Sequence, residues 1–472
     1  MNHARLVLPA IRWRESSGFV AEGPSIAAAL DLGVGGFIVF GGTADAVRTL
    51  TTELRQRAGR PLLIASDLER GAGQQFEGLT EFPPPRALAS MGREDVIAWS
   101  AHVTAREARG VGINWVFAPV ADLDVLPENP IVQSRAFGMA PADVARSVST
   151  WVRACQDSGA LACAKHWPGH GRTAQDSHAT LPSVTAPASV LEAEDLVPFR
   201  AAISAGVASL MTAHVAYPAL DPFGLPATLS PTMLKALRQE GFEGLVVTDA
   251  LIMDGALQGR SEAQACVAAI AAGCDVLLYP NDPAAVVAAL SRAMADHTLS
   301  RSRVQEALAR YEHAAERAEQ PVPPPERVTP FASAGALADA LLVRGMWRST
   351  APSLQEPIEL VVVDDDVGGP YPVSPVTAVG ETLAALGVRV GSGGSRVVLV
   401  FSEPRGWKGR ADLGAAALSE LEATACDAAA VVLFGHPRLV DQIPGGSPVL
   451  GAWHRQRLMQ AAVARWIRSR LG

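Results

Sequence analysis

The chain has 472 residues, a formal net charge of −8 and 49% hydrophobic residues, which suits a folded protein of more than one domain. The acidic balance without a basic stripe argues against nucleic-acid binding, and no apolar run reaches the roughly 20 residues that span a membrane. The apolar stretch near the start is too short for a signal peptide, and the five cysteines form no CxxC pair, so we expect reduced thiols and a cytoplasmic location.

Short apolar runs, rich in β-branched residues, recur through the first three-fifths of the chain with the length of strands. They are residues 6–8, 36–40, 61–65, 113–117, 161–164, 209–213, 245–248 and 275–279. Alanine-rich segments with helical spacing alternate with these runs, for example 140–158, 191–205 and 264–272. This alternation predicts an α/β fold, a (β/α)8 barrel of the TIM type, in which catalytic groups gather at the carboxyl ends of the strands.

Ionisable residues stand at the ends of five successive runs, more than solvated loops supply by chance. In chain order they are Asp67, Arg135, Lys165 with His166, His214 and Asp249. Each has a simpler alternative: Asp67 could pair with Arg70, Arg135 could make a surface ion pair, and Asp249 could cap the next helix, with Asp254 as a rival carboxylate. Because the run LVVT is continuously apolar, it should deliver Asp249 to the rim of the barrel.

The stretch 165–182, KHWPGHGRTAQDSHATLP, combines three histidines, Lys165 and Asp176 with loop-forming Pro168, Gly169 and Gly171. In the DSH triplet, Asp176 could fix one tautomer of His178 and leave the other ring nitrogen for proton transfer, although an Asx turn is the simpler alternative. His166 and His170 would bind zinc only on one face of a helix, and proline in a helix costs about 3 kcal/mol, so we predict no metal site.

This stretch resembles the KH-F-PGHG…DSH…P signature of glycoside hydrolase family 3, in its β-N-acetylglucosaminidase branch. VVTDALIM at 246–253 resembles the nucleophile strand of that family, and the segment from MTAHVAYPALD to PATLSP at 211–231 adds to the match. The resemblance covers most of residues 1 to about 320. It implies a retaining exo-β-N-acetylhexosaminidase that removes terminal β-linked N-acetylglucosamine, from cell-wall (peptidoglycan) fragments, without a cofactor.

The resemblance also implies residue roles. Asp249 is the nucleophile, and His178, oriented by Asp176, replaces the usual second carboxylic acid as general acid and base. The residues expected to bind the substrate are Asp67, Arg135, Lys165, His166 and His214.

The sequence departs from the family pattern in DLERGAGQQF at 67–76, where Arg70 replaces a glycine and Gln75 an expected arginine, which leaves fine specificity open. Three other functions stay open. They are a phosphorylase, because a neutral acid/base would not repel phosphate, another family 3 β-glycosidase, and a sugar-binding barrel without activity.

A proline-rich run, EQPVPPPERVTP at 319–330, predicts a linker. We therefore expect a barrel over 1–318, a linker over 319–335 and a small α/β domain over 336–472. In that domain, predicted strands at 358–363, 397–401 and 431–434 alternate with helices at 377–386, 413–425 and 455–470. The acidic run 364–366 suggests either a cation or phosphate site or, more simply, a solvated loop.

Overall fold

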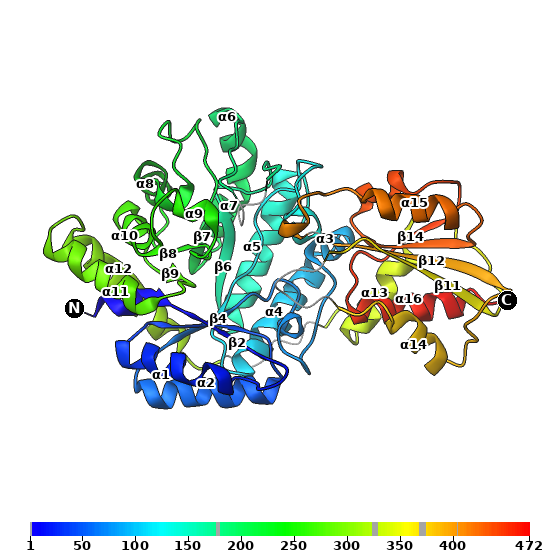
Figure 1. The fold of residues 1–472 in the computed structure, drawn as a ribbon, viewed down its shortest axis with the longest axis horizontal. Helices are drawn as coiled ribbons and strands as arrows, with labels where there is room; N and C mark the ends of the chain where they lie inside the picture. Colours follow the sequence, from blue (N-terminus) through cyan, green and yellow to red (C-terminus); the bar gives the residue numbers. More distant parts are fainter. Residues whose placement is uncertain (1, 176–179, 323–328, 368–373, 404) are drawn as a thin grey trace. The chain divides into compact units, whose positions relative to one another are not determined.

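The computed structural model describes residues 2–175, 180–322, 329–367, 374–403 and 405–472. The chain divides into two compact units (Figure 1). The first comprises Met1–Glu81, Arg93–Leu126 and Ala136–Val328, and the second comprises Phe82–Gly92, Pro127–Arg135 and Thr329–Gly472. None of the described helices is long and apolar enough to cross a bilayer.

The first unit is built on a parallel sheet whose strands, within the described residues, follow one another in chain order. These are β2 (Ala10–Arg12), β3 (Gly36–Phe40), β4 (Leu63–Ser66), β5 (Trp115–Val116), β6 (Leu161–Trp167), β7 (Ser209–Thr212) and β8 (Leu245–Thr248). A bridge between Val247 and Val276 leads from β8 to β9 (Leu277–Leu278), and β9 pairs with β1 (Val7–Leu8), which directly precedes β2. The parallel strands therefore curl round, as predicted for a (β/α)8 barrel.

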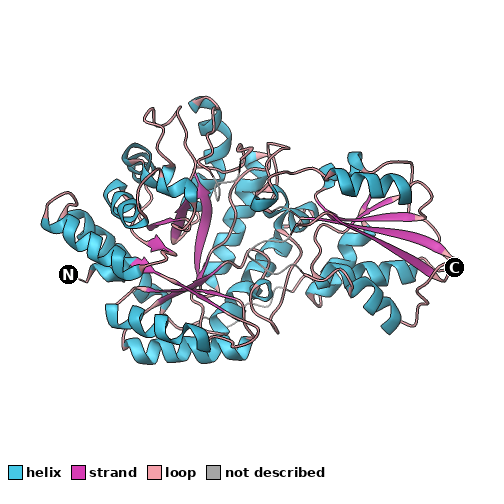
Figure 2. Cartoon of the chain, viewed as in Figure 1, coloured by secondary structure: helices cyan, strands magenta, loops and turns pink. Residues whose placement is uncertain are grey.

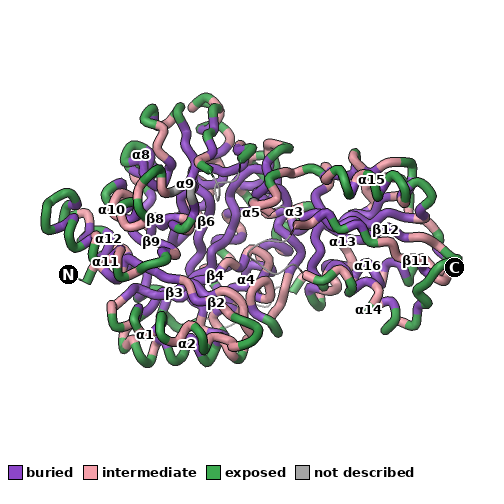
Figure 3. The backbone as a smooth tube through the Cα atoms, viewed as in Figure 1, coloured by how far each residue is buried: buried purple, intermediate pink, exposed green. Residues whose placement is uncertain are grey.

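Helices alternate with these strands and lie outside them (Figure 2). They are α1 (Gly23–Leu32), α2 (Ala44–Ala58), α4 (Glu94–Gly110), α5 (Pro141–Asp157), α6 (Ala188–Val190), α7 (Leu196–Ser204), α8 (Pro231–Gln239), α9 (Asp254–Leu257), α10 (Glu262–Ala272), α11 (Pro283–Ala295) and α12 (Arg301–Ala318). A capping box of Ser261 and Gln264 begins α10, which satisfies donors at the helix start. The strands are almost wholly buried (Figure 3), which explains their continuous apolar composition.

One predicted strand differs from the structure for a local reason. The run 6–8 continues past Pro9 as two short strands, β1 and β2, because proline has no N–H to donate to a neighbouring strand. These two pieces pair with β9 on one side and β3 on the other, which lets this part of the chain close the barrel.

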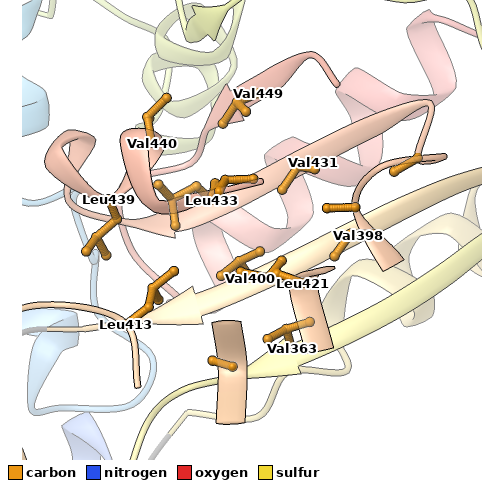
Figure 4. Close-up of a cluster of buried hydrophobic side chains, with 14 residues drawn as sticks. Val363, Val398, Val400, Leu413, Leu421, Val431, Leu433, Leu439, Val440 and Val449 are labelled. Atoms are coloured by element: carbon orange, nitrogen blue, oxygen red, sulfur yellow. The ribbon is translucent and has the colours of Figure 1, made fainter. Parts of the chain in front are cut away.

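The second unit contains a sheet of order β10-β14-β13-β12-β11 within its described residues. The strands are β10 (Met346–Arg348), β11 (Ile358–Asp364), β12 (Ser395–Ser402), β13 (Ala430–Gly435) and β14 (Val449–Gly451), and only β10 is antiparallel to its neighbour. The helices of this unit are α3 (Pro85–Ser90), α13 (Ala334–Val343), α14 (Ala378–Ala385), α15 (Ala415–Thr424) and α16 (Arg457–Ser469). A cluster around Val400, Leu421 and Leu433 fills the space between the sheet and α15 (Figure 4). The predicted α/β layers are therefore present.

The acidic run that ends β11 is not a solvated loop, so that expectation is wrong. Asp365 is buried and pairs with Lys408 and Arg410, each at 2.7 Å. Asp364 and Asp366 both pair with Arg455. The buried carboxylates of Asp365 and Asp366 need these cationic partners, because buried charges must be paired, whereas Asp364 is exposed and shares Arg455.

Candidate active site

Two of the predicted site residues, His166 and Asp249, stand at one edge of the sheet, where β6, β7 and β8 end side by side. Trp167 pairs with Thr212, and Thr212 pairs with Thr248. His166 precedes Trp167 in the chain, and Asp249 follows Thr248. The backbones of His166 and Asp249 are therefore separated by two strand spacings of about 4.8 Å each. This places both in one site at the carboxyl edge.

Lys165 lies at the centre of a buried ion-pair triad. Its Nζ is 2.6 Å from Asp67 Oδ1 and 2.7 Å from Glu69 Oε1. The side chains of Lys165 and Glu69 are nearly inaccessible, whereas that of Asp67 is 31% exposed. Asp67 therefore combines a fixed orientation with access from outside. Among the ion pairs of the described residues, Arg70 pairs with Glu81 at 2.6 Å and Asp67 pairs with Lys165, so the alternative pairing of Asp67 with Arg70 is not observed there.

His166 is oriented by Asp122, a fully buried carboxylate. His166 Nδ1 lies 2.7 Å from Asp122 Oδ2, and Asp122 Oδ1 accepts hydrogen bonds from the backbone N–H of His166 at 3.1 Å and of His170 at 2.7 Å. Burial by itself would raise the pKa of Asp122, but the neighbouring His166 and His170 lower that pKa below its usual range. The carboxylate stays ionised and fixes the ring of His166.

The meeting of Asp122 with His166 follows from the path of the chain after β5. Val120 forms a bridge with Lys165, and Ala121 donates its N–H to the carbonyl of Lys165 at 2.7 Å. Residues 120–122 therefore run alongside the end of β6, and the next side chain, that of Asp122, reaches the turn after the strand.

The first part of the 165–182 loop is anchored on three sides. Asp122 holds two of its amides, Tyr217 Oη donates to the carbonyl of Gly169 at 2.7 Å, and Arg172 Nε donates to the buried Asp195 at 2.7 Å. Gly171 is required for a steric reason, because a Cβ atom there would lie 1.7 Å from the carbonyl oxygen of Leu123. The loop is thus fixed from His166 to Arg172, four residues before the DSH triplet begins.

His170 is a buried part of this anchor. Its Nδ1 lies 2.8 Å from Thr173 Oγ1. Burial, together with the nearby His166, lowers the pKa of His170 to about 4, although the carboxylates of Asp122 and Asp249 act in the opposite direction. His170 is consequently neutral near pH 7.

The helical geometry that a zinc site on His166 and His170 would need is not formed. His166 belongs to β6, and the chain turns at Pro168 before His170, which leaves the two ring centroids 5.8 Å apart and nearly perpendicular. In the part of the chain that the structure describes, no three His, Cys, Asp or Glu side chains are grouped as metal ligands.

Asp249 directly follows β8, and its Oδ1 accepts the N–H of Ala250 at 2.7 Å. The helix α9 begins only at Asp254, with Met253 at the N-cap position, so Asp249 is not the cap of that helix. His214 supports this segment, because its Nε2 lies 3.1 Å from the carbonyl of Ala250 and its Nδ1 lies 2.8 Å from Thr228 Oγ1. The contacts of His214 thus position the backbone beside Asp249.

Three predicted site residues remain. Arg135 belongs to the second compact unit, in a short 3-10 helix (Gln133–Arg135), and donates to the carbonyl of Ile131 at 3.3 Å. Its role in sugar binding stays a prediction. Asp176 and His178 lie outside the described residues.

Sequence reasoning missed Glu69 and Asp122. Glu69 is two residues beyond Asp67 in the same loop, and this spacing is the signal that could have found it. Asp122 follows the apolar run FAPVA, but its partner His166 is 44 residues away in the chain and becomes a neighbour only through the pairing of the two segments.

Comparisons with known proteins identify the family of this chain and several relatives. The model of the Glycosyl hydrolase family 3 N terminal domain matches residues 26–313. A β-N-acetylglucosaminidase/β-glucosidase of Cellulomonas fimi is 38% identical over 280 residues, 57% of this chain and 49% of that protein, so the match spans about half of the relative. A β-hexosaminidase of Alkalilimnicola ehrlichii is 39% identical over 269 residues, 54% of this chain and 76% of the relative.

Among solved structures, a glycoside hydrolase family 3 β-N-acetylglucosaminidase from Paenibacillus sp. is similar along nearly the whole chain. Its TM-score is 0.84 at 26% sequence identity, and the superposition covers 100% of this chain and 96% of that one. The similarity therefore includes both compact units.

Proposed function

This chain belongs to glycosyl hydrolase family 3, and from that premise we propose that it is a retaining exo-β-N-acetylhexosaminidase acting on terminal β-linked N-acetylglucosamine. The single observation that carries the proposal is the position of Asp249 directly after the buried strand β8, at the same edge as the Lys165 triad and His166. The names of the relatives from Alkalilimnicola ehrlichii and Paenibacillus support the choice of an N-acetylated sugar.

In the proposed reaction, a carboxylate oxygen of Asp249 attacks the anomeric carbon and forms a glycosyl-enzyme, while the bond to the leaving oxygen breaks. His178 donates a proton to that oxygen, then takes one from the water that releases the sugar. Asp176 orients His178. The anchors at Asp122, Tyr217 and Arg172 support this role, because they fix the start of the loop that carries the DSH triplet.

Sugar contacts follow from the remaining groups. Asp67 is accessible and oriented, so it can accept hydrogen bonds from a pair of hydroxyl groups. Lys165 and His166 supply donors at the same edge, and we propose that Arg135 adds a planar donor pair for a hydroxyl or the acetamido carbonyl. We further propose cell-wall fragments as the source of the sugar and the cytoplasm as the place of action.

A panel of 4-nitrophenyl glycosides tests the activity, with the β-N-acetylglucosaminide, the β-glucoside and the β-galactoside each assayed with and without phosphate. The proposal expects preferential cleavage of the β-N-acetylglucosaminide to free sugar. A sugar 1-phosphate formed at a higher rate would show a phosphorylase, preferred β-glucoside cleavage would show another family 3 glycosidase, and no turnover would indicate a sugar-binding protein.

The nucleophile is tested with Asp249→Ala and, as a matched control, Asp254→Ala, which removes the other carboxylate of the same segment. We expect Asp249→Ala to lose several orders of magnitude in rate, far more than the roughly 1 kcal/mol of a lost helix cap. Equal losses in both variants, or near-normal activity of folded Asp249→Ala, would refute the assignment.

A chelator separates this chemistry from metal-dependent hydrolysis. Neither Asp249 nor His178 needs a metal to act, so dialysis against EDTA should leave the rate unchanged. Complete loss that added zinc restores would contradict the proposal and favour a metal site at His166 and His170.

A further inference from the structure

A cavity of about 500 Å³ opens at the end of the barrel opposite the candidate active site. Its lining includes Leu161, the first residue of β6, Ala208, which directly precedes β7, and Leu245, the first residue of β8. His166 and Asp249 stand at the carboxyl ends of the same sheet, so the length of the strands separates the two sites. The volume falls within the roughly 300–1,000 Å³ that is typical of small-molecule sites. We call this cavity the amino-end pocket.

Much of the lining of the amino-end pocket is apolar and fixed in place. Ile203, Val207 and Phe242 belong to it, and the side chains of Val207 and Phe242 are almost wholly buried. Arg238 holds the turn that carries Phe242, because its guanidinium lies 5.3 Å from the centroid of the Phe242 ring and donates to the carbonyls of Phe242 at 2.9 Å and of Gly244 at 2.7 Å. The pocket therefore offers an ordered apolar surface to the body of a ligand.

Basic side chains from one face of α12 line the same pocket. Arg310, His313 and Arg317 are spaced three and seven residues along the helix, which puts them on one side of it. Among the described residues, the side chains of His313 and Arg317 make no hydrogen bond or ion pair. Glu243 is the one carboxylate among the described residues that line the pocket. The lining therefore carries an excess of positive charge.

Arg310 also belongs to a group of arginines that outnumber their carboxylates. The fully buried Asp275 pairs with Arg310 at 3.1 Å and with Arg238 and Arg303, and Arg303 shares a second carboxylate, Glu306, at 2.7 Å. Three guanidinium groups thus meet two carboxylates. Burial lowers the pKa of Arg238, and Arg310 and Arg303 add to this effect against the attraction of Asp275, because like charges repel. An anion bound in the pocket would reduce this repulsion.

We propose that the amino-end pocket is a second binding site, which takes an amphipathic anion with one carboxylate, sulfonate or phosphate group on an apolar body. Arg310 and Arg317 bind the oxyanion, because the N–H donors of a guanidinium match two oxygens of such a group. The apolar body lies against Val207 and Phe242. Because Glu243 lines the same pocket, we expect a ligand of low charge. An inorganic anion would offer the same oxyanion chemistry without the apolar body, so the test separates the two.

The test compares two fluorescent dyes with the same ring system, 8-anilinonaphthalene-1-sulfonate, which is an anion, and N-phenyl-1-naphthylamine, which is neutral. Fluorescence titration of the full chain measures the Kd of each dye. We expect the wild type to bind the anionic dye more tightly than the neutral one. Arg317→Gln should weaken binding of the anionic dye about tenfold, as for one lost charge-assisted contact, and leave the neutral dye unchanged. Ala309→Phe, which adds volume to a residue of the lining, should weaken binding of both dyes.

Arg301→Gln is the matched control, because Arg301 is also an exposed arginine of α12 but does not line the pocket. Both of its Kd values should equal those of the wild type. An unchanged Kd of the anionic dye in folded Arg317→Gln, or equal affinities of the two dyes in the wild type, would overturn the proposal. Displacement of the anionic dye by N-acetylglucosamine would also overturn it, by placing the dye in the candidate active site.

Competition distinguishes the two kinds of anion. Octanoate, a carboxylate on an apolar chain, should displace the anionic dye from the wild type and do so more weakly in Arg317→Gln. Inorganic phosphate at the same concentration should leave the dye bound. Displacement by phosphate but not by octanoate would overturn the proposal of an amphipathic ligand. These measurements involve no turnover, so their outcome is independent of the proposed hydrolase activity.

Discussion

Asp122→Asn tests whether a fully buried carboxylate controls the site. Asparagine is isosteric and its Oδ1 can still accept the N–H groups of His166 and His170, which the carboxylate accepts at 3.1 and 2.7 Å. The amide nitrogen then faces Nδ1 of His166, where the structure has a carboxylate oxygen at 2.7 Å. The substitution therefore removes one charge-assisted hydrogen bond and leaves the backbone contacts in place.

A charge-assisted hydrogen bond contributes about 1.5–3 kcal/mol, and 1.36 kcal/mol corresponds to tenfold in rate. If that free energy orients His166 for the transition state, kcat/KM should fall roughly 10–100-fold. The loss should appear with every leaving group to a similar extent, because His166 is proposed to hold the sugar and not to protonate the leaving oxygen. Steady-state kinetics with good and poor leaving groups measure both the size and the pattern.

The matched control is Asp275→Asn, which also removes a fully buried, ion-paired carboxylate, here one that pairs with Arg238 and Arg303 at the opposite end of the strands. It should lower the free energy of unfolding while the rate per folded molecule stays normal. A normal rate in Asp122→Asn, or equal rate losses in both variants, would refute the positioning role of Asp122.

Three further predictions follow from the loop. Gly171→Ala should abolish activity and lower the melting temperature, because its Cβ would lie 1.7 Å from the carbonyl oxygen of Leu123. In the control Gly110→Ala the new Cβ has no atom within 4 Å, so activity and melting temperature should both be preserved. An active Gly171→Ala would contradict this packing. Burial lowers the pKa of His170 from 6.5 to about 4 in the folded protein, so on acidification the unfolded chain is protonated at this histidine before the folded one. The free energy of unfolding should therefore decrease by on the order of 3 kcal/mol as the pH falls from 6.5 to 4. Urea unfolding at several pH values should show this loss in the wild type and in the surface variant His297→Asn but not in His170→Asn, and the same loss in all three would exclude His170. His178→Ala should slow the cleavage of substrates with poor leaving groups about 10²–10⁴-fold more than the cleavage of activated aryl glycosides. Asp176→Ala should show a smaller difference of the same kind. If His178→Ala slowed both kinds of substrate equally, the acid/base role would belong to another residue.

The strands and their ends could be predicted because burial on both faces of a parallel strand leaves a continuous apolar run. That pattern places Asp67, Lys165 and Asp249 at the rim, since each is the first ionisable residue at the end of such a run. Helices such as α5 and α10 were recognisable from their spacing. The short strands β10 and β14 were missed, because the three residues of each carry no periodic signal.

The partners of the site residues were beyond the reach of the sequence. Lys165 could have faced solvent or substrate, and only the packing of the β4 loop against β6 gives it two carboxylates. His214 follows a strand like the others, yet its ring contacts Thr228 and the Ala250 carbonyl, which come from two separate loops. Arg135 was expected in the loop after the fourth run, and its assignment to the second compact unit depends on contacts across the whole chain.

The most direct test of the central claim is the anomeric form of the sugar that is released first, followed by proton NMR during cleavage of 4-nitrophenyl β-N-acetylglucosaminide. Attack by Asp249 and then by water inverts the anomeric carbon twice, so the β anomer of free N-acetylglucosamine should appear first and convert slowly to the α anomer. Initial release of the α anomer would contradict a covalent intermediate on Asp249.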